Sequence, residues 1–145
     1  MIEVVYPEPE FRMKQEEGKH YLFDPIRKAW ILLTEEEWVR QNFVAYLVKE
    51  KEYPYTLIAL ERELELNGLK KRFDVLIYDK AHQPWMLVEC KAPEVALSED
   101  VLQQALRYNM TLPVPYIIIT NGAHTMGWKK EGAQLQFLTE IPIHQ

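Results

Sequence analysis

Two apolar segments of strand length carry charged residues where a buried strand would normally carry none. Asp74 lies in the run 73–78, and Glu89 and Lys91 lie in the run 85–91. Burying an unpaired carboxylate is costly, so a strand that keeps one usually offers it to a metal or another cation. Because side chains alternate along a strand, Glu89 and Lys91 are expected on the same face. The combination predicts a site that binds a divalent metal and hydrolyses a phosphodiester.

Metal-dependent phosphodiester hydrolysis requires carboxylates that hold a hard cation and a second positive group that stabilises the charge developing on phosphorus. Asp74 and Glu89 supply oxygen ligands, which favour Mg²⁺ or Mn²⁺ over zinc. The backbone carbonyl of Cys90 is a further candidate ligand, and its thiol is expected on the opposite face, in the core. Lys91 is expected to orient the water or to stabilise the pentavalent phosphorus.

A predicted helix adds two polar residues to this site. Gln104 and Tyr108 are four positions apart and therefore share one helix face. The preceding loop is short, so the helix is expected to pack directly on the sheet and to bring this face to the end of the Lys91 strand. We expect one of the two side chains to position the water or a phosphate, and the other to contact the substrate backbone.

Apolar spacing, capping residues and turn signals predict the elements that position these residues, in the order α-β-β-β-α-β. The predicted segments are 34–51, 57–66, 73–78, 85–91, 99–110 and 116–120. A hairpin over 21–33 precedes them, and a strand pair near 125–129 and 135–138 closes the sheet. The expected fold is α/β, with helices on both faces of one mixed β-sheet. Residues 1–20 are predicted to be an N-terminal extension, and 21–145 one domain.

Composition limits the class of protein. The 145 residues suffice for one domain, and the longest apolar runs have the length of strands. The single cysteine excludes an internal disulfide and a cysteine-based zinc site. The N-terminus lacks the pattern of a secretory signal, so a cytoplasmic setting without membrane contact is expected. The net charge of −5 argues against nucleic-acid binding by bulk electrostatics, although it permits a local basic rim.

The ordered residues resemble the PD-(D/E)XK nuclease superfamily, in the branch with an added QxxxY motif. Those that carry the resemblance are Asp74, then Glu89-Cys90-Lys91, then Gln104-Ala105-Leu106-Arg107-Tyr108. Over residues 20 to 140 the chain is similar to the N-terminal nuclease domain of type I restriction enzyme R subunits and to small stand-alone proteins built on it. Other similar segments are Phe23-Asp24-Pro25-Ile26-Arg27-Lys28, Glu37-Trp38-Val39-Arg40-Gln41, Val88-Glu89-Cys90-Lys91-Ala92-Pro93, Arg107-Tyr108-Asn109 and Thr120-Asn121-Gly122.

The resemblance implies a restriction-endonuclease-like core and magnesium-dependent cleavage of DNA. The residues that it implies are Asp74, Glu89 and Lys91 for catalysis, with Gln104 and Tyr108 as the auxiliary pair. Such domains often carry another acid on the first helix, where Glu37 is the better-placed candidate and Glu36 the second. R subunits also carry motor domains, so a separate restriction or motor subunit is an expected partner. Two cuts on a duplex need two active sites, which makes a homodimer a further option.

Each of these residues also has a structural explanation. Asp74 could cap a turn, and Glu89 with Lys91 could form an exposed salt pair of little energetic value. Tyr108 could be a core residue with its hydroxyl at the rim, and a capping box with Thr34 explains Glu37 by itself.

The remaining charged residues leave further alternatives open. Arg27, Arg40 and Arg107 could contact phosphates or be solvated charges, and residues 70–72 could form a phosphate-binding rim or a basic turn. The four histidines have no ligand spacing and are expected at the surface or in loops. Three hypotheses therefore follow: a metal-dependent nuclease, a non-cleaving nucleic-acid-binding or assembly module, and a structural remnant without metal binding.

Overall fold

The computed structural model describes residues 1–145 and contains two β-sheets and two α-helices. The main sheet has six strands in the order β4-β5-β6-β7-β8-β9, and a separate sheet has the order β1-β2-β3. The helices are α1 (Glu35–Lys49) and α2 (Glu99–Asn109), with a short 3-10 helix at Tyr55–Leu57. The strands are β1 (Met13–Glu16), β2 (Lys19–Asp24), β3 (Ala29–Leu32), β4 (Ile58–Leu66), β5 (Leu69–Tyr78), β6 (Pro84–Cys90), β7 (Tyr116–Thr120), β8 (Thr125–Glu131) and β9 (Gln134–Phe137).

The main sheet is mixed, as the sequence predicts. Strands β4, β5 and β6 form an antiparallel meander, β7 runs parallel to β6, and β8 and β9 continue antiparallel. Because parallel neighbours need a crossover connection, α2 links β6 to β7 across one face of the sheet. The predicted order α-β-β-β-α-β of the core is confirmed. The Asn67-Gly68 turn joins β4 to β5 with positive φ angles of 51° and 78°, which asparagine and glycine tolerate.

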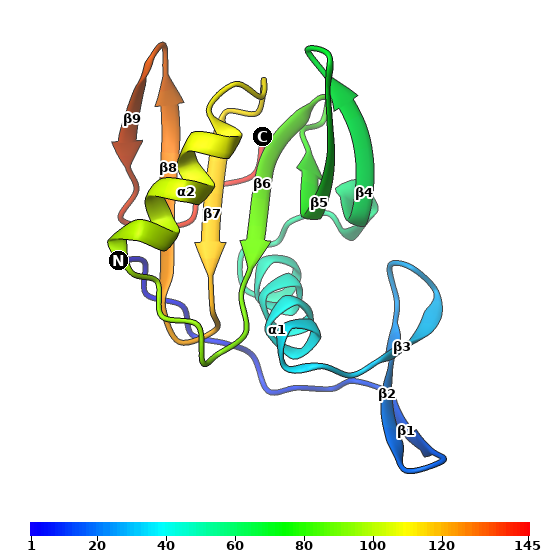
Figure 1. Ribbon diagram of the computed structural model, residues 1–145. Coiled ribbons are helices and arrows are strands. Elements are labelled where there is room, and N and C mark those ends of the chain that lie inside the picture. Colours follow the sequence, from blue (N-terminus) through cyan, green and yellow to red (C-terminus); the bar gives the residue numbers. More distant parts are fainter.

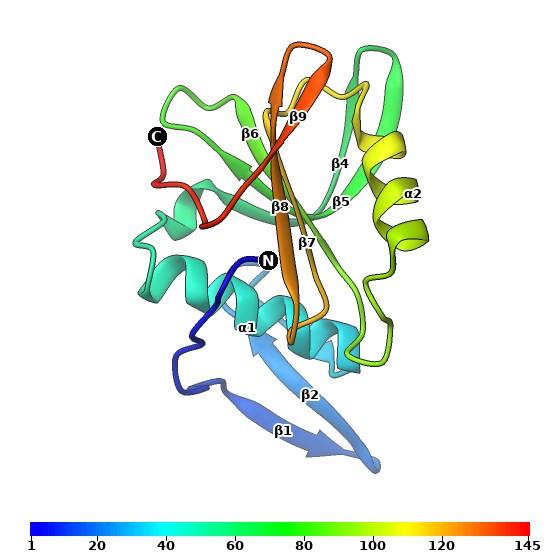
Figure 2. The ribbon, with the colours of Figure 1, turned by 90° about the vertical axis from the view of Figure 1, so that its left-hand side faces the viewer.

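The two helices cover opposite faces of the main sheet (Figures 1 and 2). On one face Phe43 of α1 belongs to a buried cluster with Val88 of β6. On the other face Leu106 of α2 belongs to a second cluster with Leu87 of the same strand. Alternation along β6 from Met86 to Cys90 therefore sends even-numbered side chains toward α1 and odd-numbered ones toward α2. Neither helix combines the length and the apolar character needed to cross a membrane.

Both helices begin at the residues that the sequence predicts. The Thr34 hydroxyl accepts a hydrogen bond from the Glu37 amide at 3.0 Å, and the Ser98 hydroxyl accepts one from the Val101 amide at 3.3 Å. These bonds satisfy amides that have no partner inside the first helical turn. The caps fix where α1 and α2 start, and therefore which side chains of each helix face the sheet.

The small sheet lies beyond α1, apart from the main sheet (Figures 1 and 2). Strands β2 and β3 form the predicted hairpin, and β1 extends it as a third antiparallel strand that the polar sequence of residues 13–16 does not reveal. The segment 1–20 also reaches the core, because Ile2 is only 3% exposed and its amide donates to the Thr125 carbonyl at 2.8 Å.

One local expectation is wrong: strand β5 starts at Leu69 rather than at Phe73, because the Asn67-Gly68 turn leads directly into paired residues. His144 lies in the irregular segment after β9, as expected for a loop histidine, but it is buried. Its ring packs against Tyr53 and Trp85, and its Nε2 lies 2.8 Å from the Tyr78 carbonyl oxygen. The earlier start of β5 matters for the site, because it places Lys71 inside the sheet.

Candidate active site

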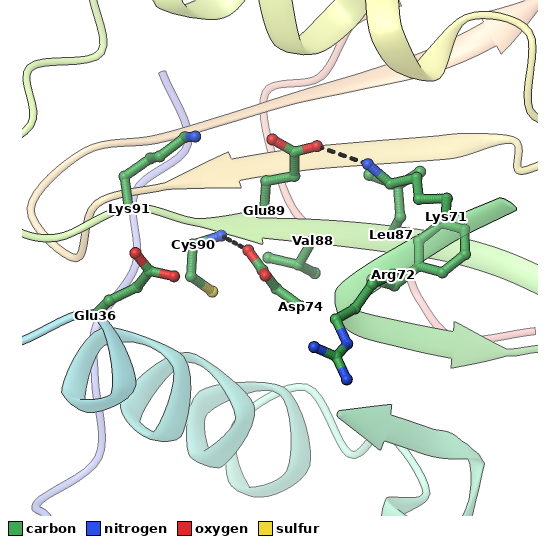
Figure 3. A pocket seen from close by; sticks show the side chains of 10 residues that line it. Glu36, Lys71, Arg72, Asp74, Leu87, Val88, Glu89, Cys90 and Lys91 are labelled. Carbon is green, nitrogen blue, oxygen red and sulfur yellow. Dashed lines mark hydrogen bonds and ion pairs between the residues drawn. The ribbon is translucent and has the colours of Figure 1, made fainter. Parts of the chain in front are cut away.

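The pairing of β5 with β6 ends at the predicted acidic position. The ladder runs up to the pair Val75 and Val88, so the next position would place Asp74 opposite Glu89. There a side chain replaces the backbone bond: the Cys90 amide donates to Asp74 Oδ2 at 2.9 Å (Figure 3). The strands separate at this point, which leaves the Asp74 carboxylate in a hollow at the sheet.

The pairing of β5 with β4 is interrupted at the same residue. Glu61 would pair with Asp74 but adopts a positive φ of 52°, outside the extended region. Arg40 of α1 fills the gap, since its guanidinium donates to the Asp74 carbonyl at 3.3 Å and also to the Glu61 carboxylate. A buried arginine thus replaces a ladder bond and fixes the backbone of Asp74 from the side opposite to β6.

A cavity of about 230 Å³ opens at this break in the sheet (Figure 3). Its walls include Asp74 of β5, Glu89 of β6 and Lys91, which follows β6 directly. Glu89 and Lys91 project from the same side of the chain in Figure 3, as their spacing requires. The fold therefore brings together the three charged residues that sequence spacing singled out.

Asp74 is held in a setting that disfavours its charge. Burial raises the pKa of this carboxyl, and the nearby negative charge of Glu89 acts in the same direction. The Cys90 amide and Arg40 oppose these effects without reversing them. A carboxylate kept partly dehydrated beside a second carboxylate gains from a bound cation, which would relieve both effects.

Glu89 is more firmly engaged than Asp74. Its Oε1 accepts hydrogen bonds from Lys71 Nζ at 3.0 Å and from Asn109 Nδ2 at 2.9 Å. Neither donor binds its other oxygen, Oε2, which in Figure 3 lies on the Lys91 side of the carboxylate. One oxygen is thus used to fix the side chain, and the other is left for a ligand.

Cys90 presents only its backbone to the site. Its side chain is 2% exposed and belongs to the core cluster on the α1 face, which confirms the predicted direction of the thiol. Burial raises the pKa of the Cys90 thiol well above its ordinary value, so it stays protonated and is a poor nucleophile. The carbonyl remains its candidate ligand atom.

Gln104 and Tyr108 line a second cavity of about 310 Å³ that adjoins the first. The two cavities share three wall residues, namely Lys71, Glu89 and Lys91. Both α2 residues are exposed, and the Tyr108 ring lies 4.3 Å from Lys71 Nζ. The helix face that sequence spacing defines therefore reaches the end of β6.

The acid from α1 at the cavity is Glu36, and the preference for Glu37 is wrong. Glu37 is buried on the other side of the helix, where its carboxylate binds Arg40, Arg27 and Gln41. Adjacent residues on a helix point about 100° apart, so only one of the two can face the cavity. Partial desolvation at the cavity and the charge of Asp74 raise the pKa of Glu36, as expected for an exposed carboxyl at the edge of the same cavity.

The family of the type I restriction enzyme R protein N terminus (HSDR_N) matches residues 35–142. The chain belongs to this family. The matched region starts at α1 and includes both helices, the whole main sheet and every residue of the two cavities, whereas β1, β2 and β3 precede it. A comparison with curated protein sequences finds no significant match. Membership relates the chain to restriction enzymes and to a nuclease-type hydrolase in general.

Three residues of the chain have roles in the site that the sequence analysis did not assign to them, although Arg40 and the segment 70–72 were candidates for contact with phosphates. Lys71 and Asn109 bind Glu89, and Arg40 binds the backbone of Asp74. Asn109 gave a usable signal, since it is a polar residue one position after Tyr108 on the predicted helix. Lys71 would have been found had β5 been started directly after the Asn67-Gly68 turn. The sequence contains no signal that distinguishes the buried Arg40 from an arginine exposed to solvent.

The donor set fits a cation that keeps much of its own water. No group of three or more histidine, cysteine, aspartate or glutamate side chains lies close enough to form a complete metal site. Mg²⁺ is usually held by one or two carboxylates together with waters and substrate phosphates. Asp74 and Glu89, with the Cys90 carbonyl as a further candidate ligand, meet this lower requirement.

Proposed function

We propose that this protein is a metal-dependent nuclease that hydrolyses phosphodiester bonds of DNA, with Mg²⁺ or Mn²⁺ as its cofactor. The observation that carries the proposal is the single cavity between β5 and β6 lined by Asp74, Glu89 and Lys91. Family membership supports the same conclusion, because it relates the chain to the R protein of type I restriction enzymes.

Asp74 Oδ1, Glu89 Oε2 and the Cys90 carbonyl are the atoms proposed to hold the metal. When bound, such an ion polarises the scissile phosphate and makes water a stronger nucleophile. Lys91 lies beside Glu89 at the same cavity and supplies a positive charge for the phosphorane oxygens. Arg40 keeps Asp74 in place through its backbone and does not need to touch substrate.

The adjoining cavity offers a place for the rest of the substrate backbone. Gln104 has an amide and Tyr108 a hydroxyl, both suited to phosphate oxygens, and both side chains are exposed. Arg72 is exposed at the edge of the first cavity and adds a positive charge to its rim. These contacts are local, which is compatible with a chain whose net charge is −5.

A second candidate function is a non-cleaving module that binds nucleic acid or assembles with a separate restriction or motor subunit. The observation that favours it is the engagement of Glu89 by Lys71 and Asn109, which reduces its availability to a metal. The negative net charge points the same way, because tight binding of DNA usually needs clustered basic residues.

Incubation of supercoiled plasmid with the full chain and Mg²⁺ tests the nuclease. Asp74→Ala and Lys91→Ala should each lower the cleavage rate by about 100-fold or more, as expected for groups that stabilise the transition state. Lys80→Ala, which removes an exposed lysine outside both cavities, should cleave like the original protein. Equal rates in all four proteins would refute the proposal, because contaminating nuclease would then be the source.

Two experiments distinguish the hypothesis of a binding module from that of a nuclease. The first is calorimetric titration with Mn²⁺, and the second is incubation with single-stranded, duplex, branched and RNA substrates. Binding of Mn²⁺ that Glu89→Ala abolishes, without cleavage of any substrate, would favour the module. Cleavage that depends on both Mn²⁺ and Asp74 would favour the nuclease.

A further inference from the structure

Lys71 occupies an unusual position for a lysine. Its side chain is only 8% exposed, and its ammonium lies 3.0 Å from Glu89 Oε1. The same ammonium lies 4.3 Å from the centre of the Tyr108 ring and 5.6 Å from that of Phe73. Lysine is almost never buried unless it is paired, so the partner that justifies this burial is Glu89.

The pair is part of the wall between the two cavities. Lys71 and Glu89 line both cavities, and the cation–π contact between Lys71 and Tyr108 links β5 to α2. Asn109, which is fully buried, adds a neutral donor to the same Glu89 oxygen and also binds the Ala105 carbonyl at 2.8 Å. Glu89 is therefore held by two donors, of which one carries a charge and the other does not.

We propose that Lys71 is the resident counter-ion of Glu89: it neutralises the carboxylate while no metal is bound, and it weakens metal binding by sharing that carboxylate with the incoming cation. Asn109 is proposed to be a positioning residue that holds Oε1 and leaves Oε2 turned to the cavity. This inference rests on the metal site of the proposed function, and it makes predictions of its own about affinity and stability.

The two donors should act on a metal in opposite directions. Two cations on one carboxylate repel each other, and the repulsion is stronger at a half-buried site than in water. Removing the charge of Lys71 should therefore tighten metal binding, provided that Asn109 still orients Glu89. Removing Asn109 leaves the charge in place but frees the carboxylate to rotate, so metal binding should weaken.

Calorimetric titration of the full chain with Mn²⁺ compares Lys71→Met, Lys71→Arg, Asn109→Ala and the unchanged protein. Lys71→Met should bind about three- to tenfold tighter, the size of a weakly screened charge–charge term. Lys71→Arg, which keeps the charge, should bind like the unchanged protein, and Asn109→Ala should bind more weakly. A Lys71→Met affinity that is unchanged or lower would overturn the inference.

Thermal unfolding gives a second readout without catalysis. Lys71→Met leaves the Glu89 carboxylate unpaired, so its melting temperature should fall in metal-free buffer and recover with Mn²⁺ by more than that of the unchanged protein. Equal Mn²⁺-induced shifts would contradict the inference. Lys71→Gln, which keeps a neutral donor, gives the same comparison where Lys71→Met does not fold.

These experiments distinguish a failure of the counter-ion inference from a failure of the proposed nuclease function. Tighter Mn²⁺ binding by Lys71→Met in a protein that cleaves no substrate would support the counter-ion and refute the nuclease. Metal-dependent cleavage with equal Mn²⁺ affinity in the Lys71→Met variant would support the nuclease and refute the counter-ion. Absence of Mn²⁺ binding in all variants would refute both.

Discussion

The Cys90 amide donates a hydrogen bond to Asp74 Oδ2 at 2.9 Å, at the point where β5 and β6 stop pairing. The bond joins the strand that carries Asp74 to the strand that carries Glu89, so the two carboxylates are fixed relative to each other. Arg40 fixes the other side of Asp74 through its backbone carbonyl. The Asp74 carboxylate thus stays half-buried, and β5 loses its backbone pairing with both β4 and β6 at this residue.

Asp74→Asn should make the metal-free protein more stable and remove its metal-dependent cleavage. Burial raises the pKa of Asp74, so stability from this group is present below its usual pKa of 3.8 and is lost as the pH rises through the raised value. At neutral pH, Asp74→Asn should therefore gain roughly 0.5–1 kcal/mol in the free energy of unfolding, as when a strained functional group is removed. Urea unfolding at pH 7 and pH 3 measures the gain, which should disappear at the lower pH.

An exposed acid serves as the control for that experiment. Glu3→Gln changes the net charge by the same amount at an exposed residue outside the helices and away from both cavities. An equal gain in the two variants would assign the effect to net charge and contradict the role of burial at Asp74.

Local sequence signals were sufficient for most of the fold. Thr34 and Ser98 cap the helices as predicted, and Asn67-Gly68 makes the predicted turn, because these features depend on residues a few positions apart. Strand β1 was missed because it pairs through its backbone with β2 and has no apolar alternation. Its existence depends on a neighbour rather than on its own residues.

The sequence was sufficient to predict that Asp74, Glu89 and Lys91 belong to the site. It was not sufficient to predict the residues that bind them. Strand periodicity places Glu89 and Lys91 on one face without any knowledge of the tertiary structure. The selection of Glu36 over Glu37 depends on Arg27 and Arg40, which reach Glu37 from a turn and from the next turn of α1. The pairing of Lys71 with Glu89 depends on the register of three strands and the position of α2. No short-range pattern encodes these contacts.

Glu36→Gln should lower cleavage with little effect on stability. Glu36 is exposed at the cavity and makes no ion pair, so its removal leaves no buried group without a partner. We expect the free energy of unfolding to change by less than about 0.5 kcal/mol. A carboxylate that helps to bind the metal or its waters should contribute about tenfold or more to the rate at low Mg²⁺. Plasmid cleavage across a Mg²⁺ titration measures this, and an unchanged rate would exclude Glu36 from the site.

Ile2→Ala should destabilise the whole domain. Ile2 is 3% exposed in the α1-side cluster, and its side chain occupies the space beside Gly127 that a larger residue there would need. Truncation of a buried isoleucine typically costs at least about 2 kcal/mol. Urea unfolding should show this loss, whereas Val5→Ala, which truncates an exposed residue of the same segment, should unfold like the original protein. Equal midpoints would mean that residues 1–20 are a dispensable extension.

Glu37→Gln should destabilise the protein at neutral pH, and the effect should shrink in acid. Burial alone would raise the pKa of Glu37, but hydrogen bonds from Arg40 and Arg27 outweigh it and hold the pKa at about 2, against a usual value of 4.5. A lowered pKa means that this stability is fully present above pH 4.5 and is lost as the pH falls toward 2. Because Arg40 is buried and would lose a charged partner, the loss at pH 7 should be roughly 3 kcal/mol. Urea midpoints of the two proteins should therefore approach each other as the pH falls from 4.5 toward 2, and a constant difference across this range would show that Glu37 acts through packing rather than charge.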